Sequence, residues 1–314
     1  MASKFVVPSS DAVFNTPDPF LEFLERRTPE ERASILARMG QSVLSRTAVR
    51  LQCLDHHGKV LTWASGFVLR EGGTNFLYTC WHVVSGYGTP HRLTIPGERP
   101  DRASLRLFLQ DLEERGGYEA IGGITSADLS LRDENGRPVW LQQPEQQPNP
   151  DLNAIGLRVP RQCDVVRIAL PRSLKVSQLT LLTTEFTSQA VLPGDRLSIV
   201  GYPHGYSADG EADLTAVVLT RHVAAIAAGG RRDRLVLDGP GTPGMSGSPV
   251  FAWDKAGHPR LLGIYSGIVH PGAGVSHPEF AASLGECFRL WNLGGENGPG
   301  LCAPGWLDSE TAPE

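Results

Sequence analysis

The feature that most constrains this chain is a two-residue hydrophobic alternation that recurs in short segments from Val49 almost to the C-terminus. Val49, Leu51 and Cys53 alternate with polar residues, and after a turn at 56–59 a second apolar segment covers 60–69. Alternation with period two predicts strands, and intervals rich in Gly, Pro and Asn predict the turns between them. The 35 glycines and 24 prolines among 314 residues favour many tight turns over long helices. The pattern therefore predicts an all-β sandwich or barrel.

Further strands are expected at similar intervals along the chain. A strand over 75–84 carries His82 near its end. Later segments with strand character are 104–110, 126–132, 137–142, 163–170, 178–184, 195–201, 213–226, 234–238, 248–253 and 260–268. The segment 143–150, rich in proline and glutamine, is expected to form a polar surface loop. No internal repeat of solenoid length interrupts this order, so one continuous β-rich region is predicted.

Both ends of the chain carry patterns that favour helices. Residues 28–31 combine an N-cap threonine, a proline at the first helical position and a capping-box glutamate, which predicts a helix running to about Ser45. A shorter helix is expected over 18–25. Near the other end, helical spacing of apolar residues predicts a closing helix over 278–291. The apolar residues at that spacing are Phe280, Leu284, Cys287 and Leu290.

Composition excludes several classes of protein. With 29 Lys and Arg against 34 Asp and Glu the net charge is -5, so no basic field exists to bind nucleic acid. Apolar runs are far shorter than the roughly 20 residues of a membrane-spanning helix. The N-terminus shows no basic segment followed by an apolar one, so export is not expected and a cytoplasmic location is favoured.

The cysteines point to reduced, buried side chains. The five residues Cys53, Cys80, Cys163, Cys287 and Cys302 are widely spaced and include no C-x-x-C pair. We expect them to be small apolar core residues, with a bridge between Cys287 and Cys302 as the alternative. The nine histidines likewise show no metal-ligand spacing. Neither a metal nor an organic cofactor is therefore expected.

A glycine-flanked serine carries the clearest chemical signal. Ser246 lies within the segment 244–251, in a turn that leads directly into a strand, and the glycines there permit close approach of a substrate. A serine hydroxyl becomes a useful nucleophile only when a base removes its proton and an acid orients that base. His82 is the candidate base, and Asp164, at the start of an apolar segment, is the candidate acid. The order His, Asp, Ser is one of the known triad orders.

Asp128 is the competing candidate for the acid. It also starts an apolar alternation, and it lies closer to His82 along the chain than Asp164 does. The strand that follows Asp128, however, ends quickly in the turn 132–136, as an inserted hairpin would. Asp164 is therefore favoured as the partner of His82.

Six segments together carry a resemblance to a known family. They are Ala64–Leu69, Tyr78–Val84, Cys163–Ile168, Val200–Gly205, Gly244–Phe251 and Leu262–Gly267. In this order they resemble the chymotrypsin/trypsin-like serine peptidases, and among those the bacterial, disulfide-free branch that includes the high-temperature-requirement proteases. The resemblance covers residues 47–292. Together with the helix patterns described above, it divides the chain into an N-terminal helical extension over 1–46, a protease domain of two β-barrels over 47–292 and a C-terminal tail over 293–314.

The resemblance also implies a fold and a set of roles. The fold would be all-β, a double six-stranded β-barrel of the chymotrypsin type, with an N-terminal helical segment and a helix closing the C-terminus. Ser246 would attack the scissile carbonyl, His82 would accept its proton and Asp164 would hold the imidazole in place. The N–H groups of Gly244 and Ser246 would form the oxyanion hole. Residues Tyr265, Ser266 and Gly267 would supply the strand edge to which a peptide substrate adds.

Two positions depart from the digestive enzymes of the family. Met245 stands where those enzymes have an aspartate that pairs with a new N-terminus, which excludes activation by that ion pair. Pro240 stands six positions before the serine, where those enzymes have the residue at the base of the specificity pocket. Asp238 is the nearby residue that could still give a preference for basic side chains.

The function expected from the sequence is a serine endopeptidase. Its substrate would be a protein or peptide, and its activity would be controlled by a regulatory protein partner. The first alternative is a catalytically silent peptide-binding or scaffold protein on the same fold, which would not need all three of Ser246, His82 and Asp164. The second is an esterase acting on small acyl substrates, because the same three residues permit that reaction.

Overall fold

The structure, a computed structural model, describes most of the β-rich region and isolated parts of the N-terminal segment. The described residues are 7–8, 28, 31, 43–86, 102–115, 118–142, 164–176, 181–182, 187, 190–208, 214–226, 234–268 and 284–289. The predicted helix over 18–25, the predicted loop over 143–150 and the predicted tail over 293–314 lie outside them. Within the described residues, no helix is both long and apolar enough to cross a membrane.

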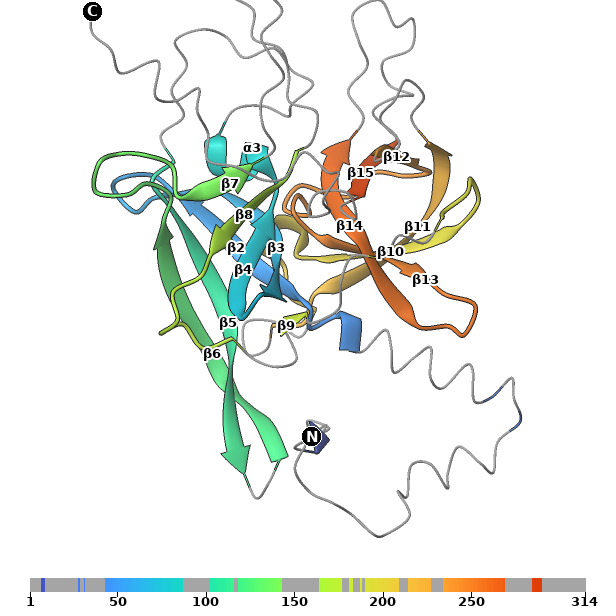
Figure 1. The fold of residues 1–314 in the computed structure, drawn as a ribbon, viewed down its shortest axis with the longest axis horizontal. Helices are drawn as coiled ribbons and strands as arrows, with labels where there is room; N and C mark the ends of the chain where they lie inside the picture. The colour runs from blue at the N-terminus through green and yellow to red at the C-terminus, as the bar shows by residue number, and fades with distance from the viewer. Residues whose placement is uncertain are drawn as a thin grey trace, which may run out of the picture.

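The first half of the chain forms a nine-stranded sheet (Figure 1). Its strands are β1 (Val7–Pro8), β2 (Ala48–Leu54), β3 (Val60–Glu71), β4 (Thr74–Thr79), β5 (Ser104–Arg115), β6 (Tyr118–Ser130), β7 (Trp140–Gln142), β8 (Val166–Ala169) and β9 (Leu181–Leu182). They pair in the order β1-β6-β5-β2-β3-β4-β8-β7, and β9 joins β3 in parallel. The antiparallel pairing of β4 with β8 places Thr79 opposite Val166, which brings the ends of these two strands together.

The second half forms a closed six-stranded barrel beside this sheet (Figure 1). Its strands are β10 (Arg196–Gly201), β11 (Val217–Ile226), β12 (Arg234–Leu237), β13 (Pro249–Trp253), β14 (Pro259–Ile268) and β15 (Gly285–Arg289). They pair in the order β10-β11-β12-β15-β14-β13, and β13 closes the barrel against β10. Closure pairs every strand on both sides, so this half has no exposed sheet edge along its ladder.

Two clusters of buried side chains form the core of the described protein. One cluster fills the barrel and includes Leu197, Leu235 and Val250. The other combines residues of the first sheet with barrel residues such as Phe251 and Phe288. Because the second cluster draws on both halves, burial of its apolar area stabilises their contact as well as each half.

The strand prediction is confirmed in outline, and the expected pair of six-stranded barrels is confirmed only for the second half. In the first half the described strands form an open order rather than a six-stranded ring. The described strands also differ from the expectation in the β5–β6 hairpin, which is longer, with pairing from Ser104 opposite Ser130 to Arg115 opposite Tyr118. In addition, β7 pairs with β8 at one end of the order, and β1 pairs with β6 at the other.

The closing helix predicted over 278–291 is wrong where the structure describes it. Residues 285–289 form β15, which pairs with β12 on one side and β14 on the other. Cys287 packs in the barrel cluster, whereas Phe288 packs in the cluster shared with the first sheet. Both faces of the strand are buried, so its sequence lacks the polar alternation that marks a half-exposed strand. The apolar residues at helical spacing were therefore misleading.

The N-terminal capping box is present as predicted. The Thr28 N–H donates to Glu31 Oε2 over 3.0 Å, and the Glu31 N–H donates to Thr28 Oγ1 over 3.2 Å. Glu31, Val43 and Leu44 are helical. Leu44 is buried in the cluster shared by the two halves, so the end of this segment packs on the β-rich region.

Three cysteines can be compared with the sequence prediction. Cys53, Cys80 and Cys287 are buried and form no disulfide among the described residues, as expected for reduced core residues. Cys163 and Cys302 lie outside the described residues. Because Cys287 is free in the structure, the alternative of a bridge to Cys302 is not supported.

Candidate active site

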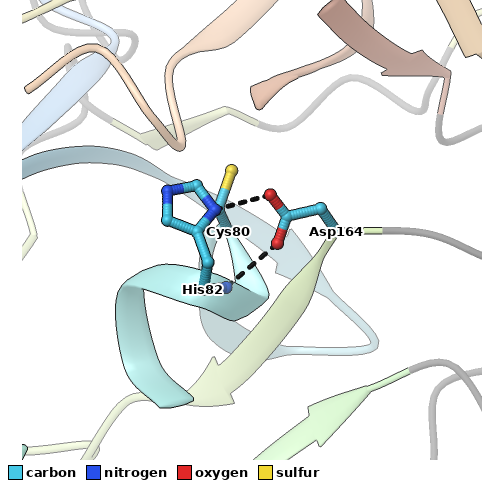
Figure 2. Close-up of side chains that lie close together, drawn as sticks. All are labelled: Cys80, His82 and Asp164. Carbon is cyan, nitrogen blue, oxygen red and sulfur yellow. Dashed lines mark hydrogen bonds and ion pairs between the residues drawn. The ribbon is translucent and has the colours of Figure 1, made fainter. Parts of the chain in front are cut away.

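His82 lies in a short helix rather than at the end of a strand. The strand expected over 75–84 ends at Thr79 as β4, and the chain then turns into α3 (Trp81–Ser85). Gly86 ends this helix with φ of 75° and donates its N–H to the His82 carbonyl. The sequence did not reveal this change, because buried apolar residues continue from the strand through the helix. The helix turns the His82 side chain toward Asp164 (Figure 2).

Asp164 lies just before β8 and binds His82 through both of its oxygens. The distance from His82 Nδ1 to Asp164 Oδ2 is 2.6 Å, and the His82 backbone N–H donates to Asp164 Oδ1 over 3.0 Å. Ser266 Oγ donates to Asp164 Oδ2 over 2.5 Å. The β4–β8 pairing accounts for this meeting, since it aligns the residues that follow Thr79 with those that precede Val166.

The carboxyl of Asp164 is fully buried, yet its pKa lies below the usual value. Burial alone would raise this pKa, but the charge of His82 and the hydrogen bonds from His82 and Ser266 outweigh burial. Asp164 is therefore ionised at neutral pH and acts as an acceptor. An ionised acceptor at Nδ1 keeps the proton of a neutral imidazole on Nδ1, which leaves the lone pair of Nε2 free.

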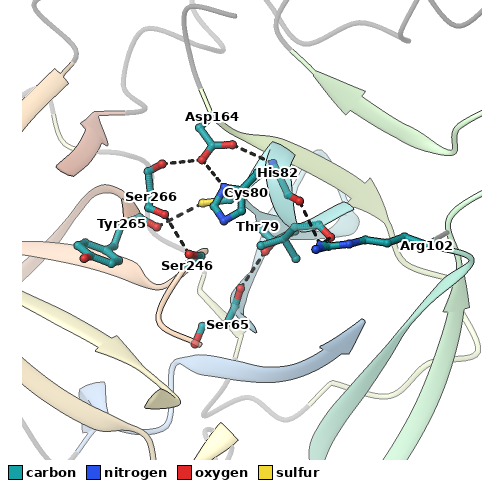
Figure 3. Close-up of polar contacts among 10 residues, drawn as sticks. Ser65, Thr79, Cys80, His82, Arg102, Asp164, Ser246, Tyr265 and Ser266 are labelled. Carbon is teal, nitrogen blue, oxygen red and sulfur yellow. Dashed lines mark hydrogen bonds and ion pairs between the residues drawn. The ribbon is translucent and has the colours of Figure 1, made fainter. Parts of the chain in front are cut away.

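Ser246 lies in the turn before β13, next to the same group of side chains (Figure 3). Its Oγ donates to the Ser266 carbonyl over 3.0 Å, and no hydrogen bond joins it to the His82 ring in the described structure. The turn is fixed from both halves. The Ser65 N–H donates to the Ser246 carbonyl over 2.9 Å, and the Gly247 N–H donates to the Tyr265 carbonyl over 2.9 Å. The nucleophile candidate thus has a rigid backbone and a hydroxyl that can turn.

Gly247 must be a glycine for this turn to form. It has φ of 91°, and a Cβ on it would lie 2.0 Å from the Ser65 carbonyl oxygen and 2.4 Å from Thr79 Oγ1. The close approach of β3 to the turn therefore depends on the missing side chain. These close approaches hold the Ser246 turn against β3 and against Thr79 at the end of β4, the strand that precedes α3.

The backbone at Gly244 and Ser246 presents two N–H groups that no described protein atom accepts. Pro243 and Gly244 have their carbonyl oxygens turned to other partners: the His204 N–H donates to Pro243 O over 2.6 Å, and Ser65 Oγ donates to Gly244 O over 2.8 Å. Gly244 has φ of 94°. Among the described residues, the N–H groups of Gly244 and Ser246 donate to no protein atom. Two unused backbone N–H donors that are two residues apart and beside a serine hydroxyl can bind a developing oxyanion.

Sequence reasoning missed the residues that hold this backbone. Ser65 lies in the segment quoted for the resemblance, but its sequence gives no sign that it contacts the serine turn. His204 adopts φ of 51°, the one non-glycine residue with positive φ among those described. Both contacts are made through backbone groups or a small hydroxyl, so residue type alone could not predict them. Ser266 was expected only as a strand edge, and it also binds Asp164.

The competing acid Asp128 lies away from His82. It forms a bidentate pair with Arg106, at 2.7 and 2.9 Å, on an exposed part of the β5–β6 hairpin. The hydrogen bond from Arg106 holds the pKa of Asp128 below its usual value. The structure therefore assigns Asp128 to a surface ion pair, and Asp164 is the acid that meets His82.

One group of side chains has the spacing of a metal site: ligand atoms of Cys80, His82 and Asp164 lie within 4.8 Å of one another (Figure 2). Three of the candidate ligand atoms already have partners: Cys80 Sγ donates to the Tyr265 carbonyl over 3.3 Å, and Nδ1 of His82 binds Asp164 Oδ2. A metal would have to displace these hydrogen bonds. The arrangement fits proton transfer better than metal binding.

Comparison with known proteins identifies the family. The trypsin-like peptidase domain matches residues 64–264. Two solved structures are similar to this chain at low identity. The inactive form of Rv3671c from M. tuberculosis H37Rv is 14% identical, with 87% of this chain and 89% of that chain covered and a TM-score of 0.38. The serine endoprotease from Yersinia pestis is 13% identical, with 81% of this chain covered and a TM-score of 0.41.

The share of each protein that is matched differs among these comparisons. This chain spans 62% of the length of the Yersinia protein, which is less than two thirds. No curated protein sequence matches the chain. The family match, in contrast, covers more than half of the chain and includes His82, Asp164 and Ser246. The chain therefore belongs to the trypsin-like peptidase domain family.

Proposed function

We propose that the protein is a serine endopeptidase that cleaves peptide bonds through an acyl-enzyme on Ser246. The observation that carries this proposal is the buried, ionised Asp164 bound to His82, with Ser246 and two unused N–H groups beside the pair. A base, an orienting acid, a nucleophile and an oxyanion site are the complete set of groups for acyl transfer.

The reaction follows from the positions of these groups. The Ser246 hydroxyl turns from the Ser266 carbonyl to His82 Nε2, gives up its proton and attacks the peptide carbonyl carbon. The resulting oxyanion accepts hydrogen bonds from the N–H groups of Gly244 and Ser246. His82 then returns the proton to the leaving amine as the C–N bond breaks. Water, activated by His82, hydrolyses the ester and restores the hydroxyl.

A bulge in β14 suits the site for an extended peptide. The β14–β15 ladder pairs Tyr265 with Cys287 and Gly267 with Glu286, so Ser266 has no opposite residue. The Ser266 carbonyl consequently faces the Ser246 hydroxyl instead of a neighbouring strand. In the proposed complex it accepts the amide N–H of the residue before the cleaved bond, as in strand addition.

The test is labelling by a fluorophosphonate, which reacts with an activated serine. The purified full chain should be labelled at Ser246, and Ser246→Ala and His82→Ala should each abolish both labelling and peptide hydrolysis. Hydrolysis that survives in Ser246→Ala would end the proposal. Peptide binding without labelling or turnover would support the alternative of a silent binding protein. Hydrolysis of small esters but of no peptide would support the esterase alternative.

Control by a regulatory protein partner is part of the proposal. Its support is the family resemblance, since the hydrogen bond of the Ser246 hydroxyl to Ser266 O does not by itself require a partner: the substrate amide binds the same carbonyl. Addition of lysate from the source cells should raise or lower the rate of Ser246 labelling. An unchanged rate at every lysate concentration would argue against such a partner.

A further inference from the structure

Tyr265 lies between β14 and the segment that leads to Ser246. Its hydroxyl accepts a hydrogen bond of 2.6 Å from the Gly241 N–H, and the residue is only 1% exposed. A Cβ on Gly241 would come within 2.9 Å of the ring, and a Cβ on Gly285 would come within 3.3 Å of its other edge. The phenol therefore spans the distance from β14 to the backbone at Gly241 and is held at both ends.

A substrate in the proposed complex directs one of its side chains to this place. Its carbonyl oxygen would lie at the N–H groups of Gly244 and Ser246, and the amide N–H of the same residue would bind the Ser266 carbonyl. The α-carbon between these two groups then lies between β14 and the segment 239–244. The side chain on that carbon points toward Gly241 and Tyr265.

We propose that the Tyr265 ring occupies the space for the side chain before the cleaved bond, so that the enzyme cleaves after small residues such as Ala, Gly or Ser. This inference rests on the proposed serine endopeptidase function. A larger side chain would have to displace a buried ring and break its hydrogen bond to Gly241. Loss of a buried hydrogen bond and a steric conflict both reduce the rate constant for cleavage after large residues.

The charges near this space also disfavour a basic side chain. Asp238, the residue that could have bound one, is tied to His222: its Oδ2 lies 2.9 Å from His222 Nδ1, and its Oδ1 accepts from the His222 N–H over 2.9 Å. Arg221 Nη2 donates to the Pro240 carbonyl over 2.8 Å. A cation therefore contacts the residue at the expected base of the pocket, and a Lys or Arg side chain would be repelled.

The experiment compares peptides that differ only in the residue before the cleaved bond: Ala, Val, Leu, Phe, Glu and Lys. The wild-type enzyme should cleave after Ala with kcat/KM at least ~100-fold above that for Phe or Lys. Tyr265→Ala should reverse the ratio of Ala to Phe or Leu, because removal of the ring opens the space. Tyr265→Phe keeps the ring and should keep the preference for Ala, which distinguishes ring volume from the hydroxyl.

Fluorophosphonate labelling of Ser246 is measured in parallel for every variant. Labelled wild-type enzyme that cleaves after Phe or Lys as well as after Ala would overturn the inference and leave the serine endopeptidase intact. Labelled Tyr265→Ala with an unchanged preference would do the same. If Tyr265→Ala fails to fold, the wild-type and Tyr265→Phe profiles still decide between the outcomes. Wild-type enzyme without labelling would overturn the proposed function and this inference with it.

Discussion

Among single residues, Asp164 has the surroundings that most clearly indicate a role. It is fully buried, accepts two hydrogen bonds from His82 and one from Ser266, and has a lowered pKa. An ionised carboxylate without solvent needs such partners to remain stable in the fold. The same partners make it a rigid support for the imidazole ring.

Replacement of Asp164 by Asn should lower kcat by about 10⁴-fold, because an amide no longer holds the imidazole in the required tautomer. The measurement is steady-state hydrolysis of a peptide substrate by the purified variant. Asp128→Asn is the matched control, since Asp128 pairs only with Arg106 on the exposed hairpin. That variant should retain nearly full activity. A large loss in Asp128→Asn with a small one in Asp164→Asn would contradict the assignment of the acid.

The carboxyl of Asp164 should make the free energy of unfolding depend on pH. Its pKa in the folded protein is below the value of about 3.9 for an unfolded chain, so it binds a proton more readily after unfolding. Its stabilising contribution is present above pH ~4 and is lost as the pH falls through the lower, folded value. Urea unfolding followed from pH 7 to pH 3 should show this decline. In Asp164→Asn the acid-dependent decline should be smaller; an identical decline would refute the contribution.

At the scale of strands and turns, Gly263 in β14 and Gly123 in β6 differ in the space around their α-carbons. A Cβ on Gly263 in β14 would lie 1.9 Å from the Phe288 carbonyl oxygen, whereas a Cβ on Gly123 in β6 would meet nothing within 4 Å. Gly263→Ala should therefore force β14 and β15 apart and lower the free energy of unfolding by about 1–3 kcal/mol. Gly123→Ala is the control and should change it little. Thermal unfolding of both variants would measure this, and equal melting temperatures would count against the close contact.

The strands best predicted are short apolar segments that lie between turns rich in glycine, proline or asparagine. The segment 195–201 and the observed β10 (Arg196–Gly201) agree closely, as do 248–253 and β13 (Pro249–Trp253). β15 was not predictable, because its Cys287 also fits a helical spacing with Phe280, Leu284 and Leu290, and the burial of both strand faces leaves no alternation to outweigh that pattern. α3 was hidden for a related reason, since buried apolar residues continue from β4 into the helix.

The candidate site was predictable only where residue type carries the chemistry. A serine among glycines, a histidine after a strand and an aspartate before one could be recognised in the sequence, and the structure brings Asp164 rather than Asp128 to His82. The supports from Ser65 and His204 act on backbone carbonyls. Any residue has an N–H group to donate, so the sequence does not mark such contacts.

At the scale of the whole molecule, Arg50 connects the two halves. It lies in β2 and is only 2% exposed, its Nη1 donates to the Gly205 carbonyl over 3.2 Å, and its guanidinium lies 4.2 Å from the centre of the Phe108 ring. Gly205 follows His204, whose N–H binds the Pro243 carbonyl next to Gly244. A single cation thus links the first sheet to the backbone of the proposed oxyanion site.

Arg50→Leu should lower the free energy of unfolding by about 2 kcal/mol, because a charge-assisted hydrogen bond and a cation–π contact are lost. It should also reduce kcat, since the turn that holds Pro243 loses its anchor. Urea unfolding and peptide hydrolysis measure the two effects. Arg132→Leu is the matched control, because Arg132 Nη1 also donates to a glycine carbonyl, over 2.9 Å, but in an exposed hairpin. Equal stability of the two variants would disprove the role of Arg50.

The bulge at Ser266 has a consequence for the order of events in the whole molecule. Its carbonyl oxygen accepts a hydrogen bond from the Ser246 hydroxyl, and in the proposed complex it also accepts one from the peptide amide. A carbonyl oxygen has two lone pairs, so the amide can bind while the hydroxyl is still bound, and the second hydrogen bond weakens the first. In the proposed mechanism, substrate binding therefore also favours the turn of the Ser246 hydroxyl toward His82, so that recognition of the peptide and preparation of the nucleophile are coupled.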